Sequence, residues 1–481
     1  MNGNVERPRH AGWFARLAQQ RLTYFAVDGG AGAHQLAVLA RQSPYLVPIG
    51  TPRHADCLLI VAPLSQKLAA AVDLLRDALP AHAKIILYHP AELPDMALPA
   101  MPDTTLSPDA QPLTTLTAAA VRAAYLSAPE MQAMRLPLPL TDVTIDLPSP
   151  SEIATELVVL SLGPVQPFTA GPARFWLICD GEQVVECRVE AGYAARGIAT
   201  MMTGVTWERA AHLAAQYDPL APIAGRLAFV QAVEQVQNYQ PDDFTREMRA
   251  DALALERAQN VLWWYVRFLQ LLALTPRATH AAALANALDD AIAQVWSEPP
   301  ATWIAPQQSA SSRVATTLKV LQTLAHAIAA LAHTARTDRW LKLRTVGIGA
   351  MELHHRGTVP NGLPGMEGSN DVQSRLLTRL QLAVSALDDV VGHATLRRDR
   401  ATRDAIWQVP AGEATSSVAG PRGAVRAHLV SAGTANPHHV TWSTPSAAIL
   451  PLIPQLFAGQ KVADAEIILA SFDLVMAEAD G

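Results

Sequence analysis

A proline-fixed turn leads into a helix in the stretch Ala214–Glu234, AAQYDPLAPIAGRLAFVQAVE. Proline fixes its own backbone and cannot continue a helix, so Pro219 and Pro222 hold the turn rigid. The apolar residues that follow recur at a spacing that places them on one helix face: Leu227, Phe229, Val230 and Val233. The stretch predicts a rigid turn at the head of a buried, amphipathic helix in a mainly helical domain.

The rest of that domain, residues 156–481, combines long helices with small sheets. Two strands at its start are joined by a hairpin turn at Asp180–Gly181. The C-terminal part returns to strands and turns and closes with the helix PSAAILPLIPQLFAG. Helical patterns lie between these strand regions, at 206–215, 227–237, 244–274, 278–295, 312–337 and 371–393. We therefore expect a mainly α-helical α+β domain.

Within a first domain of residues 1–105, residues 22–100 alternate strand and helix signals. Apolar strands are expected at 22–27, 56–63 and 83–90, with the helix SQKLAAAVDLLRDAL between the last two. Short apolar strands separated by a helix indicate a parallel sheet, so this domain belongs to the α/β class. The proline-rich segment 106–155 is interpreted as a linker to the second domain.

The composition excludes some classes of function. The chain carries 37 basic and 43 acidic residues, a net charge of −6, and so has no basic field for nucleic acid. The longest apolar run, Val261–Leu274, carries Arg267 at its centre and falls short of the roughly 18 residues that a membrane span needs. The N-terminus lacks the basic-then-apolar order of a signal peptide. We expect a cytoplasmic protein without a membrane span.

The common motifs of catalytic and metal sites are incomplete in this chain. The glycine turn at 29–32 follows a strand, but a dinucleotide fingerprint needs a third glycine where Gln35 stands. The histidine pairs at 354–355 and 438–439 favour solvated loop residues over a chelate, because adjacent side chains point to different faces. Carboxylates and arginines interleave over 240–257, which is typical of a solvated helix face, with a catalytic role as the alternative. The cysteines lack metal spacing, and the first of them lies in an apolar run that indicates a core residue: Cys57, Cys179 and Cys187.

Several stretches, in matching order, resemble one superfamily: the small and large subunits of energy-converting nickel–iron hydrogenases and the homologous core pair of respiratory complex I. TPRHADCLLIVAPLSQKLAAAVDLLRDALP resembles a strand and helix of the small subunit. LSLGPVQPFTAG, EAGYAARGIATMM, ERAQNVLWWYVRFLQLLAL and the opening turn resemble successive parts of the large subunit. PAGEATSSVAGPRGAVRAHLVSAGTANPHHVTWSTPSA and KVADAEIILASFDLVMAEADG resemble its C-terminal hairpin and final segment.

The resemblance covers roughly residues 20–92 and 155–481. It implies that a small and a large subunit are fused in one chain. The first domain would then be flavodoxin-like, as in the complex I small subunit, and the second would have the fold of the hydrogenase large subunit.

The resemblance also implies where cofactor ligands would stand. Two Cys-x-x-Cys pairs hold the nickel in the hydrogenases, because soft thiolates suit that metal. Those positions fall on Asp218 and Ala221, and on Val475 and Glu478, none of which is a cysteine. Asp218 and Glu478 are the candidates for catalysis in a repurposed cavity, since the family brings their two segments together. The alternative is that both point to solvent or to an arginine.

In complex I a quinone replaces the metal, and the resemblance implies a loop histidine and a turn tyrosine as its contacts. These positions fall on Ala170, with the first loop histidine at Gln166, and on Pro219. Tyr217 lies two residues away and is a weak substitute candidate. A further family histidine and acid fall on Ala195 and Ala199.

The small subunit's iron–sulfur cluster needs four thiolates. The first three positions fall near Gly30, Ala33 and Glu92, and the fourth has no counterpart. Cys57 cannot replace four ligands. Because every redox position is changed together, we expect no nickel–iron centre, no iron–sulfur cluster and no other cofactor.

Three hypotheses of function follow. The first is a redox-inactive structural or coupling subunit, cytoplasmic and peripheral on the inner face of the cell membrane, docked on integral membrane subunits, with a ferredoxin-like subunit as a further candidate partner. The second is an enzyme, either a residual quinone-linked oxidoreductase or a cavity enzyme for hydration or hydrolysis. The third is an assembly factor that mimics the large subunit. The loss of ligands with retention of scaffold motifs favours the first.

Overall fold

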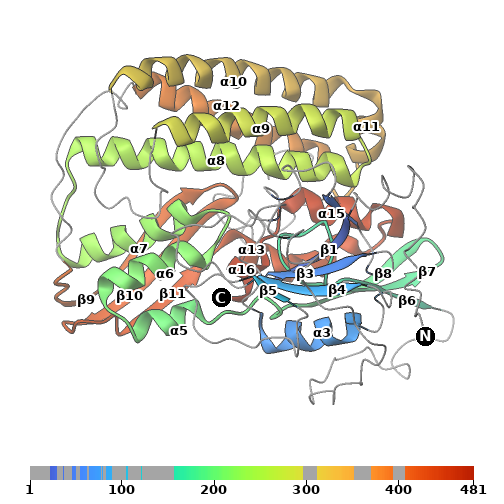
Figure 1. Ribbon diagram of the computed structural model, residues 1–481, viewed down its shortest axis with the longest axis horizontal. Coiled ribbons are helices and arrows are strands. Elements are labelled where there is room, and N and C mark those ends of the chain that lie inside the picture. The colour runs from blue at the N-terminus through green and yellow to red at the C-terminus, as the bar shows by residue number, and fades with distance from the viewer. Residues whose placement is uncertain are drawn as a thin grey trace, which may run out of the picture. The chain divides into compact units, whose positions relative to one another are not determined.

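In the computed structural model the chain divides into two units, residues 1–144 and 145–481 (Figure 1). In the second unit the structure describes residues 157–295, 311–350, 370–393 and 407–481. In the first it describes 22–29, 46–49, 55–61, 64–76, 83–88, 104–106 and a few single positions. The predicted linker at 106–155 falls almost wholly outside these ranges, so its boundaries stay a prediction.

The first unit is built on a parallel sheet, which confirms the alternation of strands and helix. The predicted helix is α3 (Gln66–Arg76), and the middle strand β3 is buried along its whole length, including Cys57. The strands pair in the order β2-β1-β3-β4-β5. Their bounds are β1 Leu22–Asp28, β2 Leu46–Pro48, β3 Cys57–Val61, β4 Lys84–Tyr88 and β5 Thr104–Leu106. The finer, flavodoxin-like assignment stays a prediction.

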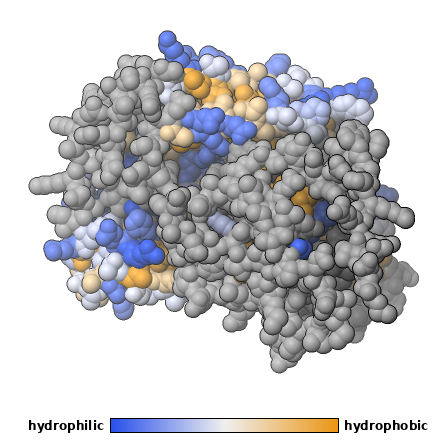
Figure 2. Space-filling model, viewed as in Figure 1, coloured by the Kyte–Doolittle hydropathy of each residue, from blue (hydrophilic) through white to orange (hydrophobic). Residues whose placement is uncertain are grey.

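Long helices form one layer of the second unit (Figure 1). Asp242 and Asp338 begin two of these helices, because their carboxylates accept free N–H groups of the first turn. On the face seen in Figure 2, the described outer part of this layer is mostly hydrophilic around one hydrophobic area. The helices are α8 Asp243–Leu271, α9 Thr275–Val295, α10 Ser311–Thr337, the short α11 Arg339–Thr345, and α12 Val372–His393.

A second part of this unit packs helices on an antiparallel sheet of order β11-β10-β9. Gly225 of α7 lies where a Cβ would stand 2.6 Å from the Ala214 carbonyl oxygen, so glycine lets α6 and α7 approach closely. The elements are α5 Ile198–Thr203, α6 Trp207–Tyr217, α7 Pro222–Val236, β9 Ala411–Gly420, β10 Gly423–Ala432 and β11 His439–Ser443.

The helix α7 corrects the prediction of an amphipathic helix at 227–237. It begins five residues earlier, at Pro222, because proline is favoured at the first helical position. Residues 224–230 are all buried, since α6, α8, β9 and β10 pack around it. A helix enclosed on all sides needs no polar stripe.

The remaining elements surround the C-terminal segment. The sheet β6-β7-β8 turns at Asp180–Gly181 as predicted, with Gly181 at a positive φ. The predicted helix at 445–459 is broken into three pieces, because Pro451 and Pro454 interrupt it. Two further helices, α15 and α16, were not predicted. The bounds are β6 Val158–Leu162, β7 Arg174–Asp180, β8 Gln183–Glu190, α13 Pro445–Ile449, α14 Ile453–Phe457, α15 Ala465–Phe472 and α16 Met476–Asp480, with 3-10 turns at Leu450–Leu452 and Val462–Asp464.

Candidate functional site

The turn between α6 and α7 presents Asp218 to the interior. The Asp218 carboxylate accepts the Leu220 N–H at 3.0 Å, and the Ala221 N–H is donated to the Asp218 carbonyl at 3.1 Å. Pro222 then opens α7. These local contacts fix the turn, so the carboxylate's second oxygen has a defined direction.

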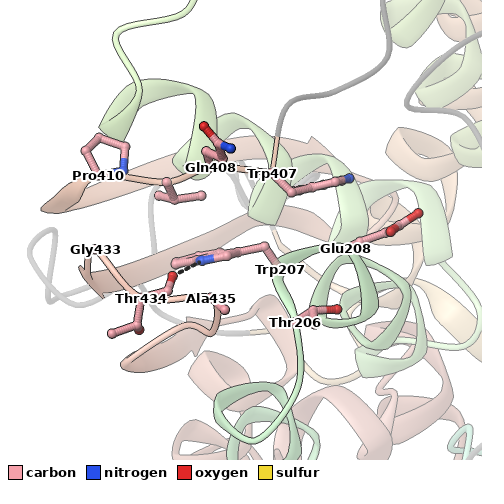
Figure 3. A pocket seen from close by; sticks show the side chains of 10 residues that line it. Thr206, Trp207, Glu208, Trp407, Gln408, Pro410, Gly433, Thr434 and Ala435 are labelled. Carbon is pink, nitrogen blue, oxygen red and sulfur yellow. Dashed lines mark hydrogen bonds between the residues drawn. The ribbon is translucent and has the colours of Figure 1, made fainter.

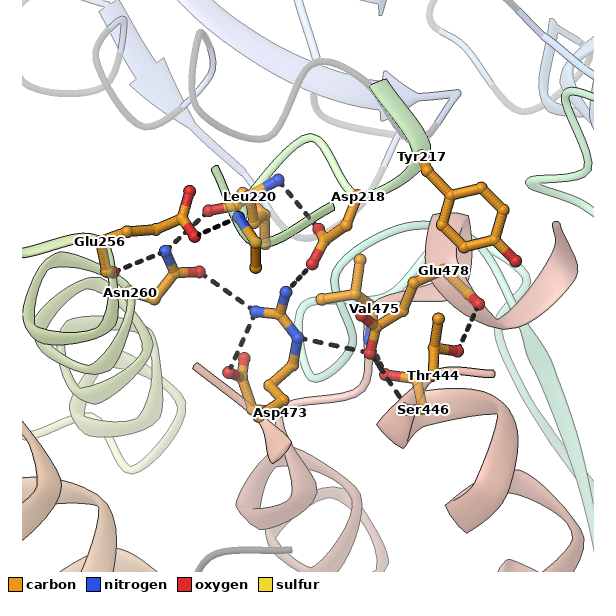
Figure 4. Close-up of polar contacts among 12 residues, drawn as sticks. Tyr217, Asp218, Leu220, Glu256, Asn260, Thr444, Ser446, Asp473, Val475 and Glu478 are labelled. Atoms are coloured by element: carbon orange, nitrogen blue, oxygen red, sulfur yellow. Dashed lines mark hydrogen bonds and ion pairs between the residues drawn. The ribbon is translucent and has the colours of Figure 1, made fainter. Parts of the chain in front are cut away.

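Arg422 is the centre of a buried ionic cluster (Figure 4). It stands in the β9–β10 turn and is 2% exposed. One guanidinium nitrogen pairs with Asp218, and Nε lies 3.4 Å from Glu478. The third nitrogen lies 3.7 Å from Asp473 and donates to Asn260 at 3.1 Å. A single guanidinium therefore joins three carboxylates from two distant segments of the chain.

Asp473 extends the cluster into the helical layer. Its carboxylate lies 3.1 Å from Arg267 of α8 and 3.6 Å from Arg379 of α12. Asp473 ends α15 at a φ of 52°, a left-handed conformation that aspartate and asparagine tolerate better than most residues. Arg267, the charged residue that interrupts the apolar run 261–274, is thus a member of this cluster.

Glu478 lies in α16 and is held by the first residues of α13 and by Thr444, which precedes that helix. Its carboxylate accepts the Ser446 hydroxyl and the Ser446 N–H, the latter at 3.1 Å. The same hydroxyl accepts the Val475 N–H at 3.0 Å, and Thr444 donates to the Glu478 carbonyl at 2.7 Å. Glu478 is 1% exposed, so these bonds and Arg422 replace the water it has lost.

Glu256 of α8 joins the cluster from the other side. Its carboxylate accepts the Ile223 N–H at 2.7 Å and the Ala224 N–H at 3.0 Å, two free donors of the first turn of α7. Asn260, one turn further along α8, donates to the Leu220 carbonyl at 2.7 Å. The interpretation of 240–257 as a solvated face is therefore wrong for Glu256, although it fits the exposed pair Asp243–Arg246.

Burial controls protonation in this cluster. Desolvation raises the pKa of Glu256 to about 8, although two backbone N–H groups and Arg422 oppose the shift. Desolvation likewise raises the pKa of Glu478 to about 7 against the attraction of Arg422. Burial acts to lower the pKa of Arg422, but Asp218, Glu478 and Asp473 outweigh it and raise that pKa. Arg422 is therefore charged at every physiological pH.

The raised pKa of Glu256 predicts a dependence of stability on pH. Between its ordinary pKa of 4.5 and its folded pKa of about 8, the folded chain keeps a proton that the unfolded chain has lost. The contribution of Glu256 to the free energy of unfolding therefore falls as pH rises through this window. Glu256→Gln removes this ionisation, so its stability relative to the wild type should improve from pH 5 to pH 8.

Urea denaturation at several pH values measures the effect. Glu247→Gln, an exposed position on the same helix, is the matched control and should keep a constant difference from the wild type. A constant difference for Glu256→Gln as well would contradict the raised pKa.

The family's quinone positions lie beside this cluster. Ala170 exchanges backbone hydrogen bonds of 2.8 Å with Leu474 and Met476 and so pairs with Val475. The Gln166 side chain donates to Thr169 at 2.7 Å, within its own loop. Ala170, Val475, Ala477 and Leu220 form a small apolar contact. The loop and the C-terminal segment therefore meet through alanine and valine, without a polar side chain at Ala170.

In Figure 4 the ring of Tyr217 lies on the opposite side of Glu478 from Glu256 and Asn260. Its ring stacks on Trp442 with centroids 4.7 Å apart, and burial raises the pKa of its hydroxyl. Pro219 stays half-buried in the turn, and Ala195 and Ala199 are also half-buried. The geometry therefore gives Tyr217 a packing role.

The donor set does not fit a nickel–iron centre. Ala221 and Val475 have no ligating atom, and the carboxylates of Asp218 and Glu478 are bound to Arg422. Among the described residues no three histidine, cysteine or acidic side chains come together as metal ligands. The positions that the resemblance assigns to an iron–sulfur cluster, Gly30, Ala33 and Glu92, lie outside the described residues, as does the histidine pair 354–355. The three cysteines are buried, which confirms the core position predicted for Cys57, and His438 and His439 are exposed, as the sequence indicated.

A surface pocket of about 670 Å³ lies elsewhere, between the start of α6, the approach to β9 and the β10–β11 turn (Figure 3). Trp207 and Trp407 are its aromatic residues, and the Trp207 indole donates to the Thr434 carbonyl at 2.9 Å. No residue singled out from the sequence lines it. Glu208 is its acidic residue.

Sequence reasoning missed five members of the cluster: Glu256, Asn260, Arg379, Arg422 and Asp473. One signal was available, because Asp473 and Arg422 each stand in an apolar context, and a buried charge must be paired. The partners themselves could not be inferred. Arg422 and Asp218 are 204 residues apart in the sequence, and no local pattern links them.

The comparisons with known proteins agree with this architecture. Residues 393–481 match the family model described as respiratory-chain NADH dehydrogenase, 49 Kd subunit. An NADH-quinone oxidoreductase subunit of Roseiflexus castenholzii is 24% identical over 70% of this chain and 97% of its own length. The corresponding NADH-quinone oxidoreductase subunit of Dehalococcoides mccartyi is 25% identical over 68% of this chain and 99% of its own.

A solved structure extends the likeness to the fold. A chain of the membrane-bound sulfane sulfur reductase, an archaeal respiratory membrane complex, superposes with a TM-score of 0.59 at 18% identity. The match covers 68% of this chain and 100% of that one. Within the described ranges, none of the helices combines the length and hydropathy of a membrane span. Residues 393–481 thus match the 49 kDa subunit of respiratory-chain NADH dehydrogenases, and about two thirds of the chain is similar in sequence to NADH-quinone oxidoreductase subunits and in fold to a chain of a membrane-bound respiratory complex.

Proposed function

We propose that this protein is a redox-inactive structural and coupling subunit of a membrane-bound, respiratory-type complex. The observation that carries the proposal is the closed ionic cluster around Arg422. Asp218 and Glu478 stand at two of the family's four nickel positions. Both carboxylates contact Arg422, and Glu478 also accepts hydrogen bonds from Ser446. The other two positions carry only the side chains of Ala221 and Val475. A centre with no free donor can hold the two segments together but offers nothing to a metal.

The same proposal covers the finer assignments from the sequence. The parallel sheet of residues 1–144 supports a small-subunit-like, flavodoxin-like unit fused to the large-subunit-like unit. We infer that neither unit carries a nickel–iron centre, an iron–sulfur cluster or a quinone. The homologues' membership in membrane-bound complexes supports a peripheral place on the inner face of the membrane, through integral membrane partners and a ferredoxin-like subunit.

The geometry gives less support to the enzyme alternatives. A general base for hydration or hydrolysis must meet a water molecule, whereas Asp218 and Glu478 are 4% and 1% exposed and face Arg422. A quinone contact would need a polar group near Ala170 or Pro219, and Tyr217 is stacked on Trp442. An assembly factor would use the same scaffold, and its partners distinguish it from a permanent subunit.

The decisive experiment is purification of the tagged full-length protein in mild detergent, with partner identification and nickel, iron and quinone analysis of the same sample. We expect co-purifying integral membrane subunits, with any metal assigned to other subunits. Stoichiometric nickel, iron or quinone in the chain purified alone would overturn the proposal. Association with a soluble nascent subunit alone would favour the assembly factor.

A variant at Ser446 separates a structural role from a catalytic one. Ser446→Ala removes the hydroxyl's bond to Glu478 and leaves the buried Val475 N–H without a partner, which should lower the free energy of unfolding by about 1–3 kcal/mol. If the cluster is structural, turnover of the complex per assembled copy stays unchanged. Ser417→Ala, at an exposed position on β9, is the control and should leave both quantities unchanged. A lower turnover per assembled copy would contradict the redox-inactive role.

A further inference from the structure

The short helix α11 exposes an unusual amount of apolar surface. Trp340, Leu343 and Val346 are 68%, 62% and 54% exposed, the first two more than any other large apolar side chain in the described part of the chain. They follow one another at intervals of three residues, along the outer side of the helix and just beyond its end. Leu341 and Thr345 face inward and are buried. The helix is therefore anchored on one side and apolar on the other.

Basic side chains surround these three residues. Arg336, Arg339 and Lys342 are exposed, and residues 339–346 contain no acidic side chain. Arg344 is a further cation, but it lies 3.5 Å from Asp464 and is partly neutralised by it. The chain as a whole has a net charge of −6, so the positive charge here is a local concentration.

We propose that the α11 patch, Arg336, Arg339, Trp340, Lys342, Leu343 and Val346, binds the surface of a membrane that contains anionic lipids. Charge complementarity requires a negative partner, and the exposed apolar residues require one that is apolar just below its charged surface. A layer of anionic lipids has both properties. Tryptophan settles at the level of the headgroups, aliphatic side chains enter the acyl boundary, and lysine and arginine attract the phosphates.

This inference needs only the exposed side chains of the α11 patch and does not rest on the proposed function. A shallow, charge-assisted contact of this size is weak and reversible for the isolated protein. It would add to a separate attachment through protein partners, because two weak contacts on one body reinforce each other.

The test is co-sedimentation of the purified full-length protein with vesicles of phosphatidylcholine alone or mixed with phosphatidylglycerol. We expect binding only to the vesicles with phosphatidylglycerol, weakened about tenfold or more between low salt and 0.5 M salt, since exposed charges are screened. Trp340→Ser with Leu343→Ser should weaken binding about tenfold through lost apolar contact, and Arg339→Glu with Lys342→Glu at least as much.

Lys319→Glu and Val320→Ser, at exposed positions on α10, are the matched controls and should bind like the wild type. Circular dichroism of each variant confirms that these surface changes leave the fold intact. The proposal would be overturned if the wild-type protein did not co-sediment with the anionic vesicles, or if the patch variants bound them as well as the controls do. A dimer that the Trp340→Ser, Leu343→Ser variant dissociates would also overturn it, because a second copy would then cover the patch. Failure here leaves the metal and partner analysis of the proposed function untouched.

Discussion

Arg422→Met is expected to lower the free energy of unfolding by about 3–5 kcal/mol, because it leaves the carboxylates of Asp218, Asp473 and Glu478 buried without their shared cation. Tryptophan fluorescence during urea denaturation measures the loss in the second unit, since every tryptophan but Trp13 lies there. The difference in free energy of unfolding between Arg422→Met and the wild type should shrink at low pH, because the carboxylates left without a cation take up protons there.

Two further variants make this result specific. Arg344→Met removes an ion pair with Asp464 whose arginine is 46% exposed, and it should cost less than about 1 kcal/mol. Arg422→Lys keeps the charge but loses the planar fork that reaches three carboxylates, so an intermediate loss is expected. If Arg422→Met costs no more than Arg344→Met, the cluster is not the desolvated network described above.

Asp473→Asn removes an acid from the cluster instead of a base, and it should lower the free energy of unfolding by a similar amount. Asparagine tolerates the positive φ of this position, so the change removes the carboxylate's charge without straining the backbone. It takes the shared acid from the buried Arg379 and Arg422 and from the half-buried Arg267, which should cost about 3–5 kcal/mol. The same fluorescence measurement reports it.

Asp464→Asn is the matched control, since it removes the acid of the partly exposed pair with Arg344. The double variant Arg422→Met with Asp473→Asn should cost clearly less than the two single losses added together, because the charges left behind balance better. Strict additivity would show that the two residues do not interact.

The sheet and the helices were predictable because they follow local patterns. The alternation of apolar strands with a helix indicated a parallel sheet, and the apolar spacing after residue 227 indicated the body of α7, although not its start at Pro222. The helix boundaries were less accurate where tertiary packing decides. Ile223 and Ala224 belong to α7 because Glu256, from another helix, accepts their N–H groups.

The candidate site was predictable only in part. The resemblance placed Asp218 and Glu478 near each other, and the alternative that they face an arginine describes the geometry. Which arginine they face could not be derived, because Arg422 is 204 residues from Asp218 in the sequence. The surface pattern over 240–257 likewise concealed Glu256, since a helix that passes from solvent into the core changes its environment within a few turns.

The capping of α7 by Glu256 has a consequence for how the second unit forms. Folding buries the first N–H groups of α7 away from water, so α7 gains full stability only after α8 has docked and Glu256 accepts them. Arg422 in turn lacks two of its three acidic partners, Asp473 and Glu478, until the C-terminal segment is in place. Contacts spanning 204 and 206 residues must therefore close together. The unit should fold slowly and as a single cooperative body, with partly folded chains exposing their charges to solvent.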